Sequence, residues 1–406
     1  MTGSVSAHRI PAVGIDARGL SPAYKAHYGR GTWRYLCELL RYLPQMAEES
    51  GVSIQQMDEN YLRVGSVASA ISDILPFGRM TFLNQLNLPL QLGQRDVDLF
   101  HFISHGDAPA FFGGNTVVTV LDLIPQIFPE LYSRPGQGWR FKFARYLENR
   151  AARTAASVIV ISEATKRDVH RLLDVPLERI HVTPLAVSEN FGSRVEFAGG
   201  QLPEMKKELR QDFGLNPERP VLLYLGGIDR RKNVPFLLDV LGRLKEEPLP
   251  DQQKPQLVLA GRIEKDDQYP ALLKRISELD LTDDVVLLGF VADDRLRDLY
   301  WAADIFMFPS RYEGFGLPLL EAMACGVPVL AENNSSLPEV VADPALLLRG
   351  FVAEQWAGEV KQLLACPERA EMIARAGVAH AARFSWRATA AATLEVYTEL
   401  LDRRRG

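Results

Sequence analysis

Residues 310–330 carry residue types that can bind and react with an anionic, hydroxyl-rich ligand. The segment reads SRYEGFGLPLLEAMACGVPVL and holds two carboxylates, Glu313 and Glu321, on either side of a glycine-rich loop. Gly316 permits a tight turn, and a helix that begins near Leu317 would point its free N–H groups at an anion. A helix-start carboxylate needs no ligand to explain it, but that alternative does not account for the second carboxylate and the glycines together. The segment therefore predicts a site for phosphate and sugar hydroxyls.

A second segment, LGGIDRRKNV, combines paired glycines with a run of cations. Gly226 and Gly227 let the backbone turn sharply and a ligand approach it. Arg231 and Lys232 follow, the first as a planar fork for phosphate oxygens and the second as a point charge. A solvated basic turn is the alternative interpretation of this segment taken alone.

Short apolar runs that alternate with helical stretches must position these two loops. Continuous apolar strands separated by helices are typical of parallel sheets covered on both faces. The runs predicted as strands are 11–16, 98–103, 116–124, 157–162 and 181–186, then 220–227, 256–261, 284–290, 305–310 and 328–333.

The runs form two sets separated by a polar stretch, which predicts two Rossmann-like, doubly wound α/β domains. We expect an N-terminal domain over 1–190, a linker over 191–214, a C-terminal domain over 215–385, and a last helix over 386–406 that crosses back to the first domain. Ligands of such sheets bind beyond the carboxyl ends of the strands. Two such domains in series predict a cleft between those ends.

Composition excludes several classes of protein. Of 406 residues, 47% are hydrophobic and 24% are charged, as in ordinary globular proteins. The net charge of −5 disfavours nucleic-acid binding, since such proteins usually carry a basic excess. The three cysteines, Cys37, Cys325 and Cys366, are far apart and fit a reducing cytosol, and the first ten residues show no secretory signal.

The pattern E-G-F-G-L-P-x-x-E-A-M-A-x-G-x-P-V resembles the E-x7-E signature of the family 4 glycosyltransferases, which are retaining enzymes of the GT-B fold. Further stretches, in the family's order, resemble its other motifs over roughly residues 11–349. They are GIDARGL with GRGTWRYLCELL, VLDLIPQIFPE, VIVISEATKRDVHRLL, LGGIDRRKN and NNSSLPEVVADPALLL. The subgroup that the chain resembles is that of bacterial surface-polysaccharide mannosyltransferases and their relatives.

The resemblance implies roles for individual residues. Glu313 would meet the donor sugar near O3 and O4, Glu321 would hold the ribose hydroxyls, and Arg231 with Lys232 would neutralise the diphosphate. Other expected donor contacts are Gly226, Gly227, Phe290, Val291, Gly316, Leu317 and Pro318, and, from the N-terminal domain, Gly29 and Gly31. His105 and Asp122 would face the acceptor hydroxyl, although a loop histidine without a special role is an equal alternative for His105.

The implied reaction moves a hexose from a nucleotide sugar to a hydroxyl with retention. In the same-face mechanism of the family, the leaving phosphate itself takes the acceptor's proton. We expect no obligatory metal or other cofactor, because Asp293 and Asp294 begin a predicted helix and no D-x-D motif lies in a suitable loop. Leu121 stands where many relatives have histidine, so Asp122 or His105 would take over that role.

The resemblance also implies the partners. They are a nucleotide sugar, with GDP-mannose the best guess, and a glycan or lipid-diphosphate-linked acceptor in cell-surface polysaccharide synthesis. Residues 136–153 combine aromatic and cationic side chains, which fits either a peripheral helix at the inner face of the plasma membrane or a core-facing helix. Of these we favour the core-facing helix, with Phe143 and Leu147 against the sheet, in a cytoplasmic protein.

Two other functions fit the same fold. A sugar-nucleotide epimerase or a phosphorylase would share the GT-B architecture, and an epimerase would use the donor without an acceptor. An inactive scaffold that binds a partner would not need to retain Glu313, Glu321, Arg231 and Lys232 together.

Overall fold

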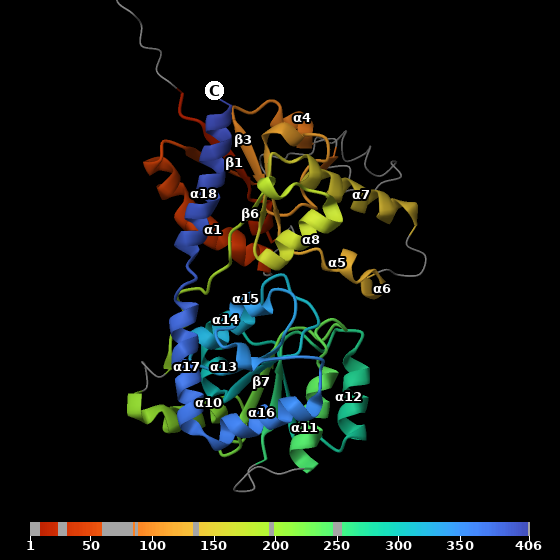
Figure 1. Cartoon of the computed structure of the whole chain (residues 1–406), viewed down its shortest axis with the longest axis vertical. Coiled ribbons are helices and arrows are strands. Elements are labelled where there is room, and N and C mark those ends of the chain that lie inside the picture. Colours follow the sequence, from red (N-terminus) through yellow and green to blue (C-terminus); the bar gives the residue numbers. More distant parts are fainter. Residues whose placement is uncertain are drawn as a thin grey trace, which may run out of the picture. The chain divides into compact units, whose positions relative to one another are not determined.

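Strands and helices alternate along the chain, as the apolar runs predict (Figure 1). The computed structural model describes residues 9–22, 31–58, 84–85, 88–132, 138–194, 199–246 and 254–404. These form two compact units, residues 1–185 with 386–406, and residues 186–385. The first unit therefore ends at 185, where 190 was expected, and the expected linker over 191–214 lies in the second unit.

The first unit contains a parallel sheet of six strands in the order β2-β1-β3-β4-β5-β6. The strands are β1 (Ala12–Asp16), β2 (Ser53–Met57), β3 (Leu99–Phe102), β4 (Thr116–Val120), β5 (Ser157–Val160) and β6 (Ile180–Val182). The sequence did not predict β2, because SIQQM is polar and lies at the edge of the sheet. The predicted strand 116–124 ends early at Val120, and a helix begins at Ile124.

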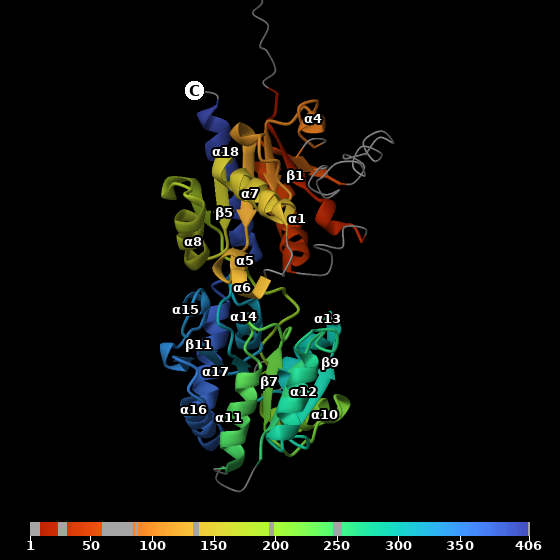
Figure 2. The same cartoon turned by 90° about the vertical axis from the view of Figure 1, so that its right-hand side faces the viewer.

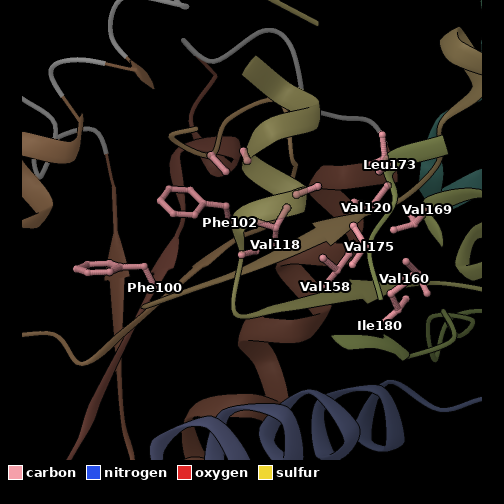
Figure 3. Close-up of a cluster of buried hydrophobic side chains, with 14 of the residues drawn as sticks. Phe100, Phe102, Val118, Val120, Val158, Val160, Val169, Leu173, Val175 and Ile180 are labelled. Atoms are coloured by element: carbon pink, nitrogen blue, oxygen red, sulfur yellow. The ribbon is translucent and has the colours of Figure 1, made fainter. Parts of the chain in front are cut away.

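Helices cover this sheet, and an apolar core fills the space beneath them. The helical segments are η1 (Arg18–Leu20), α1 (Gly31–Glu49), α4 (Leu88–Leu92), η4 (Gly113–Asn115), α5 (Ile124–Ile127), α6 (Pro129–Tyr132), α7 (Trp139–Thr154), α8 (Glu163–Leu173), η5 (Leu177–Arg179) and α18 (Trp386–Arg403). Figure 3 shows part of the core, where Val118, Val158 and Val160 from the strands gather with Val169 and Leu173 of α8. Burial of each such side chain contributes about 1.5–3 kcal/mol.

The last helix, α18, belongs to the first unit, where it packs against α1. Its Tyr397 hydroxyl hydrogen-bonds to His101 Nδ1 at 2.5 Å, and His101 Nε2 lies 2.8 Å from the Thr119 hydroxyl. Burial lowers the pKa of His101 to about 3, so the imidazole is neutral at pH 7. A buried polar network therefore ties α18 to β3 and β4.

The second unit contains another parallel sheet of six strands, in the order β12-β11-β10-β7-β8-β9. They are β7 (Val221–Leu225), β8 (Gln256–Ala260), β9 (Val285–Gly289), β10 (Ile305–Phe308), β11 (Val329–Glu332) and β12 (Leu347–Leu348). The two-residue edge strand β12 was not predicted, because a run so short gives no periodic pattern. The other five were predicted to within two residues at each end.

Ten helical segments of the described chain surround this sheet. They are η6 (Gly199–Gln201), α10 (Leu202–Asp212), α11 (Pro235–Glu246), α12 (Tyr269–Glu278), α13 (Asp293–Ala302), α14 (Leu317–Ala324), α15 (Leu337–Val340), η8 (Pro344–Leu346), α16 (Ala353–Ala365) and α17 (Pro367–Ala381). Figure 1 shows α11 and α12 on one side of the sheet and α10, α13 and α17 on the other. In Figure 2, α11 and α12 lie in front of β7. The expectation of two doubly wound α/β domains is thus confirmed. Within the described ranges, no helix is long and apolar enough to span a bilayer.

Candidate functional site

The strand order of the second sheet reverses between β7 and β10. From β7 the chain adds β8 and β9 on one side, and it then returns to place β10, β11 and β12 on the other. Ligands of open α/β sheets bind at such a switch point, beyond the carboxyl ends of the strands. The loop 226–234 follows β7 and the loop 309–316 follows β10, so both predicted motifs lie at this point.

The side chains of these two loops meet in a buried ion triplet. Lys232 Nζ lies 2.6 Å from Glu313 Oε1, and Arg231 NH1 lies 2.9 Å from the same oxygen. Arg231 NH1 also donates to the Tyr312 carbonyl at 2.6 Å, so this guanidinium braces the second loop as well as carrying charge. A second carboxylate, Asp229, lies 3.7 Å from Arg231 Nε beside the triplet. Two cations and two carboxylates balance in charge, so what this place offers an anionic ligand is directed N–H groups on Lys232 and Arg231.

The carboxylate of Glu313 stays ionised in this setting. Burial raises its pKa, but the charges of Lys232 and Arg231 outweigh that effect and hold the pKa below its usual value. An ionised carboxylate accepts hydrogen bonds and donates none, which suits contacts with sugar hydroxyls. Glu313 is therefore a hydroxyl acceptor rather than a proton donor at neutral pH.

Two serines that the sequence analysis missed hold the Glu313 loop in place. Ser335 Oγ accepts from the Glu313 N–H at 3.0 Å. Ser336 Oγ lies 3.0 and 2.8 Å from the carbonyl oxygens of Glu313 and Phe315, which share its one hydroxyl proton. Their motif, NNSSLPEVV, was noticed only as part of the family resemblance, because the long-range contact leaves no local signal.

Glu321 is more buried than is expected of a residue that binds the ribose hydroxyls of a donor. It lies in the second turn of α14, its exposed fraction is 3%, and its Oε2 accepts from the Tyr300 hydroxyl at 2.9 Å. At the start of the same helix, Gly316 has φ +105°, a conformation that favours glycine. Leu317 is the first helical residue, and Pro318 carries no N–H to offer an anion.

Of the two glycines after β7, Gly226 is the one that close packing requires, since a Cβ on Gly227 would have only an ordinary contact, at 3.9 Å from Asp229. Gly226 has φ +153°, and a Cβ there would lie 2.9 Å from the Tyr224 hydroxyl. Tyr224 in turn donates to the Gly227 carbonyl at 2.5 Å. Gly261, which the sequence analysis missed, packs so tightly that a Cβ would lie 2.1 Å from the Gly226 carbonyl oxygen.

A flat, exposed platform follows the neighbouring strands β8 and β9. The Phe290 side chain is 57% exposed, and the Arg262 guanidinium stacks over its ring at 4.4 Å. Val291 beside it is 9% exposed. A guanidinium on an aromatic ring presents a planar surface of the kind on which a nucleotide base stacks. Arg262 was not predicted, because an isolated arginine after a strand carries no motif.

In the first unit, His105 and Asp122 follow the neighbouring strands β3 and β4 and so lie at the same sheet edge. His105 Nε2 is buried without a hydrogen-bond partner among the described residues. Burial, and secondarily the charge of Arg145, lower the pKa of His105 to about 4. Asp122 Oδ1 accepts from the Ile124 N–H at 3.1 Å. Gly31 is the exposed first residue of α1, and Gly29 lies outside the described residues.

A buried ion pair at this edge was also missed. Asp16 ends β1, and Arg18 two residues later contacts both of its carboxylate oxygens, at 2.8 and 2.6 Å. Arg18 also donates to Asn84 Oδ1 at 2.8 Å and to the Asp107 carbonyl at 3.3 Å. The pair lies where the first sheet reverses its strand order, between β1 and β3. It had been noticed only within the GIDARGL resemblance.

Metal-binding groups are not gathered anywhere in the described ranges. No set of three or more His, Cys, Asp or Glu side chains in those ranges is arranged to hold an ion. Asp293 and Asp294 lie in the first turn of α13, where their negative charges stabilise the positive end of the helix dipole.

Sequence comparison matches most of the chain to two family models. Residues 29–191 match "Glycosyltransferase Family 4", and residues 205–380 match "Glycosyl transferases group 1". O-antigen chain mannosyltransferase B of Escherichia coli is 33% identical over 257 residues, which cover 62% of this chain and 64% of that protein. The chain spans less than two thirds of the length of the first curated relatives that it matches.

Two solved structures show the same fold. Sucrose-phosphate synthase of Thermosynechococcus elongatus aligns with a TM-score of 0.69 at 20% identity, over 97% of this chain and all of that chain. Anabaena HepE in complex with UDP and glucose aligns with a TM-score of 0.68 at 19% identity, over 96% of this chain and all of that one. With these motifs, this switch-point site and two tandem family matches, the chain belongs to the family 4 glycosyltransferases and has the GT-B fold.

Proposed function

We propose that this protein is a retaining hexosyltransferase. It would move a hexose from a nucleotide sugar to a hydroxyl of a glycan or lipid-linked acceptor, in cell-surface polysaccharide synthesis. The observation that carries the proposal is the Lys232–Glu313–Arg231 triplet at the switch point of the second sheet. It places two cations that can hold phosphate oxygens beside a hydroxyl-accepting carboxylate, which is what a sugar diphosphate requires.

The reaction breaks the bond between the sugar's C1 and the β-phosphate oxygen and forms a bond between C1 and the acceptor oxygen. Negative charge grows on the leaving diphosphate, and Lys232 is the cation of the triplet best suited to stabilise it, because Arg231 is also engaged with Tyr312. The acceptor's proton passes to the leaving phosphate, and no covalent enzyme intermediate forms. Glu321 is buried and accepts a hydrogen bond from the Tyr300 hydroxyl, and we assign it to the ribose rather than to the second carboxylate of a double displacement.

The roles of the remaining residues follow from their places in the fold. Phe290 with Arg262 would carry the base, Glu313 the sugar hydroxyls and Glu321 the ribose, while the loop amides near Gly316 and Leu317 would contact the diphosphate. His105, whose Nε2 lacks a partner in the described structure, would face the acceptor. GDP-mannose is the first donor to test, because the E. coli relative is named as a mannosyltransferase.

The test is a screen of the whole protein for thermal stabilisation by GDP, UDP and ADP, followed by transfer assays. Purified protein with the matching nucleotide sugars and a lipid-diphosphate acceptor should release free nucleoside diphosphate and give a product of retained anomeric configuration. Turnover of the donor without any acceptor, to an epimeric sugar, would favour an epimerase instead. No binding of any nucleotide would contradict the proposal.

We further propose that α7 brings the enzyme to the inner face of the membrane. The expectation that Phe143 faces the core is wrong: it is 37% exposed, and Trp139 and Tyr146 on the same face are 58% and 49% exposed. Leu147 does face the core, with 3% exposed. Exposed aromatic rings next to Lys142 and Arg150 fit an anionic lipid surface, where rings insert and cations meet headgroups.

Replacing Trp139 and Phe143 together by serine is expected to reduce binding to vesicles with anionic lipids about tenfold or more, because two rings that would insert into the lipid surface are lost. Co-sedimentation measures the bound fraction. The control is Leu177→Ser, since Leu177 is 49% exposed in the same unit but lies on η5. Equal loss in both variants, or no binding by the unaltered protein, would rule out α7 as the attachment surface.

A further inference from the structure

A groove lies at the amino ends of the second sheet's strands, at the edge opposite the switch-point loops. It has a volume of about 680 Å³. One wall is formed by Arg194, Lys206 of α10 and Asp304, which directly precedes β10. The other wall is formed by the end of α16 and by α17 (α10, α16 and α17 are labelled in Figure 1). All residues that line this amino-edge groove belong to the second unit.

The charged wall carries more positive charge than its own carboxylate can balance. Asp304 is shared by Lys206, which contacts Oδ1, and by Arg210, whose NH2 lies 2.5 Å from Oδ2. Arg194 adds a third cation and is only 6% exposed. Three cations against one carboxylate leave a surplus of two charges in a largely buried place, and such a surplus calls for a counter-ion.

Part of this charge has a structural use. Arg210 Nε donates to the Ala302 carbonyl at 3.0 Å, and Arg194 NH1 donates to the Trp301 carbonyl at 3.1 Å. Both contacts fall at the last turn of α13, whose negative dipole end offsets about half a unit charge. Arg194 Nε is nevertheless buried with no hydrogen-bond partner in the described structure. Arg194 itself is one of the residues that line the groove, so its buried charge acts on whatever occupies the groove.

The other residues that line the groove restrict the chemical class of ligand that it can bind. Leu363, Ala370 and Ala374 give the far wall an apolar surface, and Arg375 with Glu371 forms an exposed ion pair there. A phosphomonoester carries close to two negative charges at neutral pH, which matches the surplus. Its organic part would lie along the apolar wall.

We propose that the amino-edge groove binds a small phosphorylated molecule, with the phosphoryl group on Arg194 and Lys206 and the organic part against α16 and α17. The site is separate from the proposed donor site, because it lies at the opposite edge of the sheet. Burial lowers the pKa of Lys206 to about 8 despite the opposing effect of Asp304, and a bound dianion would raise this pKa again. Occupancy would therefore stabilise the second unit.

The test uses inorganic phosphate and phenyl phosphate, with chloride at equal ionic strength as the reference, in calorimetric titrations of the whole protein. Both phosphates should bind, and phenyl phosphate more tightly. Lys206→Met should weaken both about tenfold or more, as the loss of a charge-assisted hydrogen bond does. Lys207→Met is the matched control: the next residue of α10, half exposed and paired with Glu218, should leave binding unchanged.

Two further measurements keep the result interpretable. The titrations are repeated with the donor site saturated by nucleoside diphosphate, and the phosphate affinity should be retained, because the groove and not the donor site binds the anion. If Lys206→Met does not fold, amine-reactive labelling of the unaltered protein replaces it: phosphate should protect Lys206 and leave Lys207 unprotected. Binding no better than chloride, equal loss in both lysine variants of α10, or equal labelling with and without phosphate would overturn the proposal.

Discussion

Lys232→Met is expected to lower hexose transfer about 10²–10³-fold, the usual cost of removing one well-placed donor to a developing negative charge. The effect should fall mainly on kcat, since the charge on the diphosphate grows as the bond to C1 breaks. The protein should still fold, because Glu313 keeps Arg231 at 2.9 Å as its partner. Initial rates of nucleoside diphosphate release, with donor and acceptor varied separately, measure the change.

The matched control for this variant is Arg230→Met. Arg230 lies in the same loop, two positions before Lys232, but its side chain is exposed. It should change transfer little, because an exposed charge is screened by water and salt. If both variants lose activity equally, general loop charge rather than a placed lysine supports catalysis. If neither loses activity, the triplet is not part of the reaction site.

Arg231 is a poorer residue for this test than its charge suggests. Its guanidinium donates to the Tyr312 carbonyl as well as to Glu313, and it is 8% exposed. Removing it would leave a buried carbonyl without its donor and displace the loop that carries Glu313. A loss of activity in an Arg231 variant would therefore mix a change of charge with a change of position.

Much of this architecture could be predicted from the sequence, because it depends on local patterns. Continuous apolar runs identify buried parallel strands, and glycine-rich turns after two of them mark the loops that carry Lys232 and Glu313. That these loops meet follows from β7 and β10 being neighbours, which a parallel sheet with a switch point allows. The edge strand β2 could not be predicted in this way. It is polar, and pairing with one neighbouring strand holds it in the sheet without an apolar run.

The supporting contacts could not be predicted, since they depend on distance in space rather than in sequence. Ser335 and Ser336 hold a loop more than 20 residues away, and Arg262 stacks on a ring 28 positions further on. The face of α7 that packs on the core was predicted only in part, for another reason. Phe143 and Leu147 lie four residues apart on one broad apolar face, so periodicity placed both against the sheet. It did not show that the border between exposed and buried side chains falls between them.

Gly261→Ala is expected to destabilise the second unit by about 3 kcal/mol or more, because it combines a strained backbone with a direct clash. Gly261 has φ +136°, and its added Cβ would lie 2.1 Å from the Gly226 carbonyl oxygen. Neither group can yield easily: the Gly261 N–H donates to the Gly289 carbonyl at 2.7 Å, and the Gly226 N–H donates to the Ala260 carbonyl at 2.9 Å. Denaturant unfolding, monitored with and without nucleoside diphosphate, measures the loss.

The same substitution at Gly242, in the middle of α11, should act in the opposite direction. No atom lies within 4 Å of a Cβ built there, so alanine should stabilise the helix by about 0.5–1 kcal/mol. Gly261→Ala should also weaken nucleoside diphosphate binding, because the displaced Gly226 begins the loop that carries Lys232. Equal midpoints for the two variants would show that the loop after β7 has room to move, and the close packing of Gly226 on Gly261 would then not be what positions Lys232.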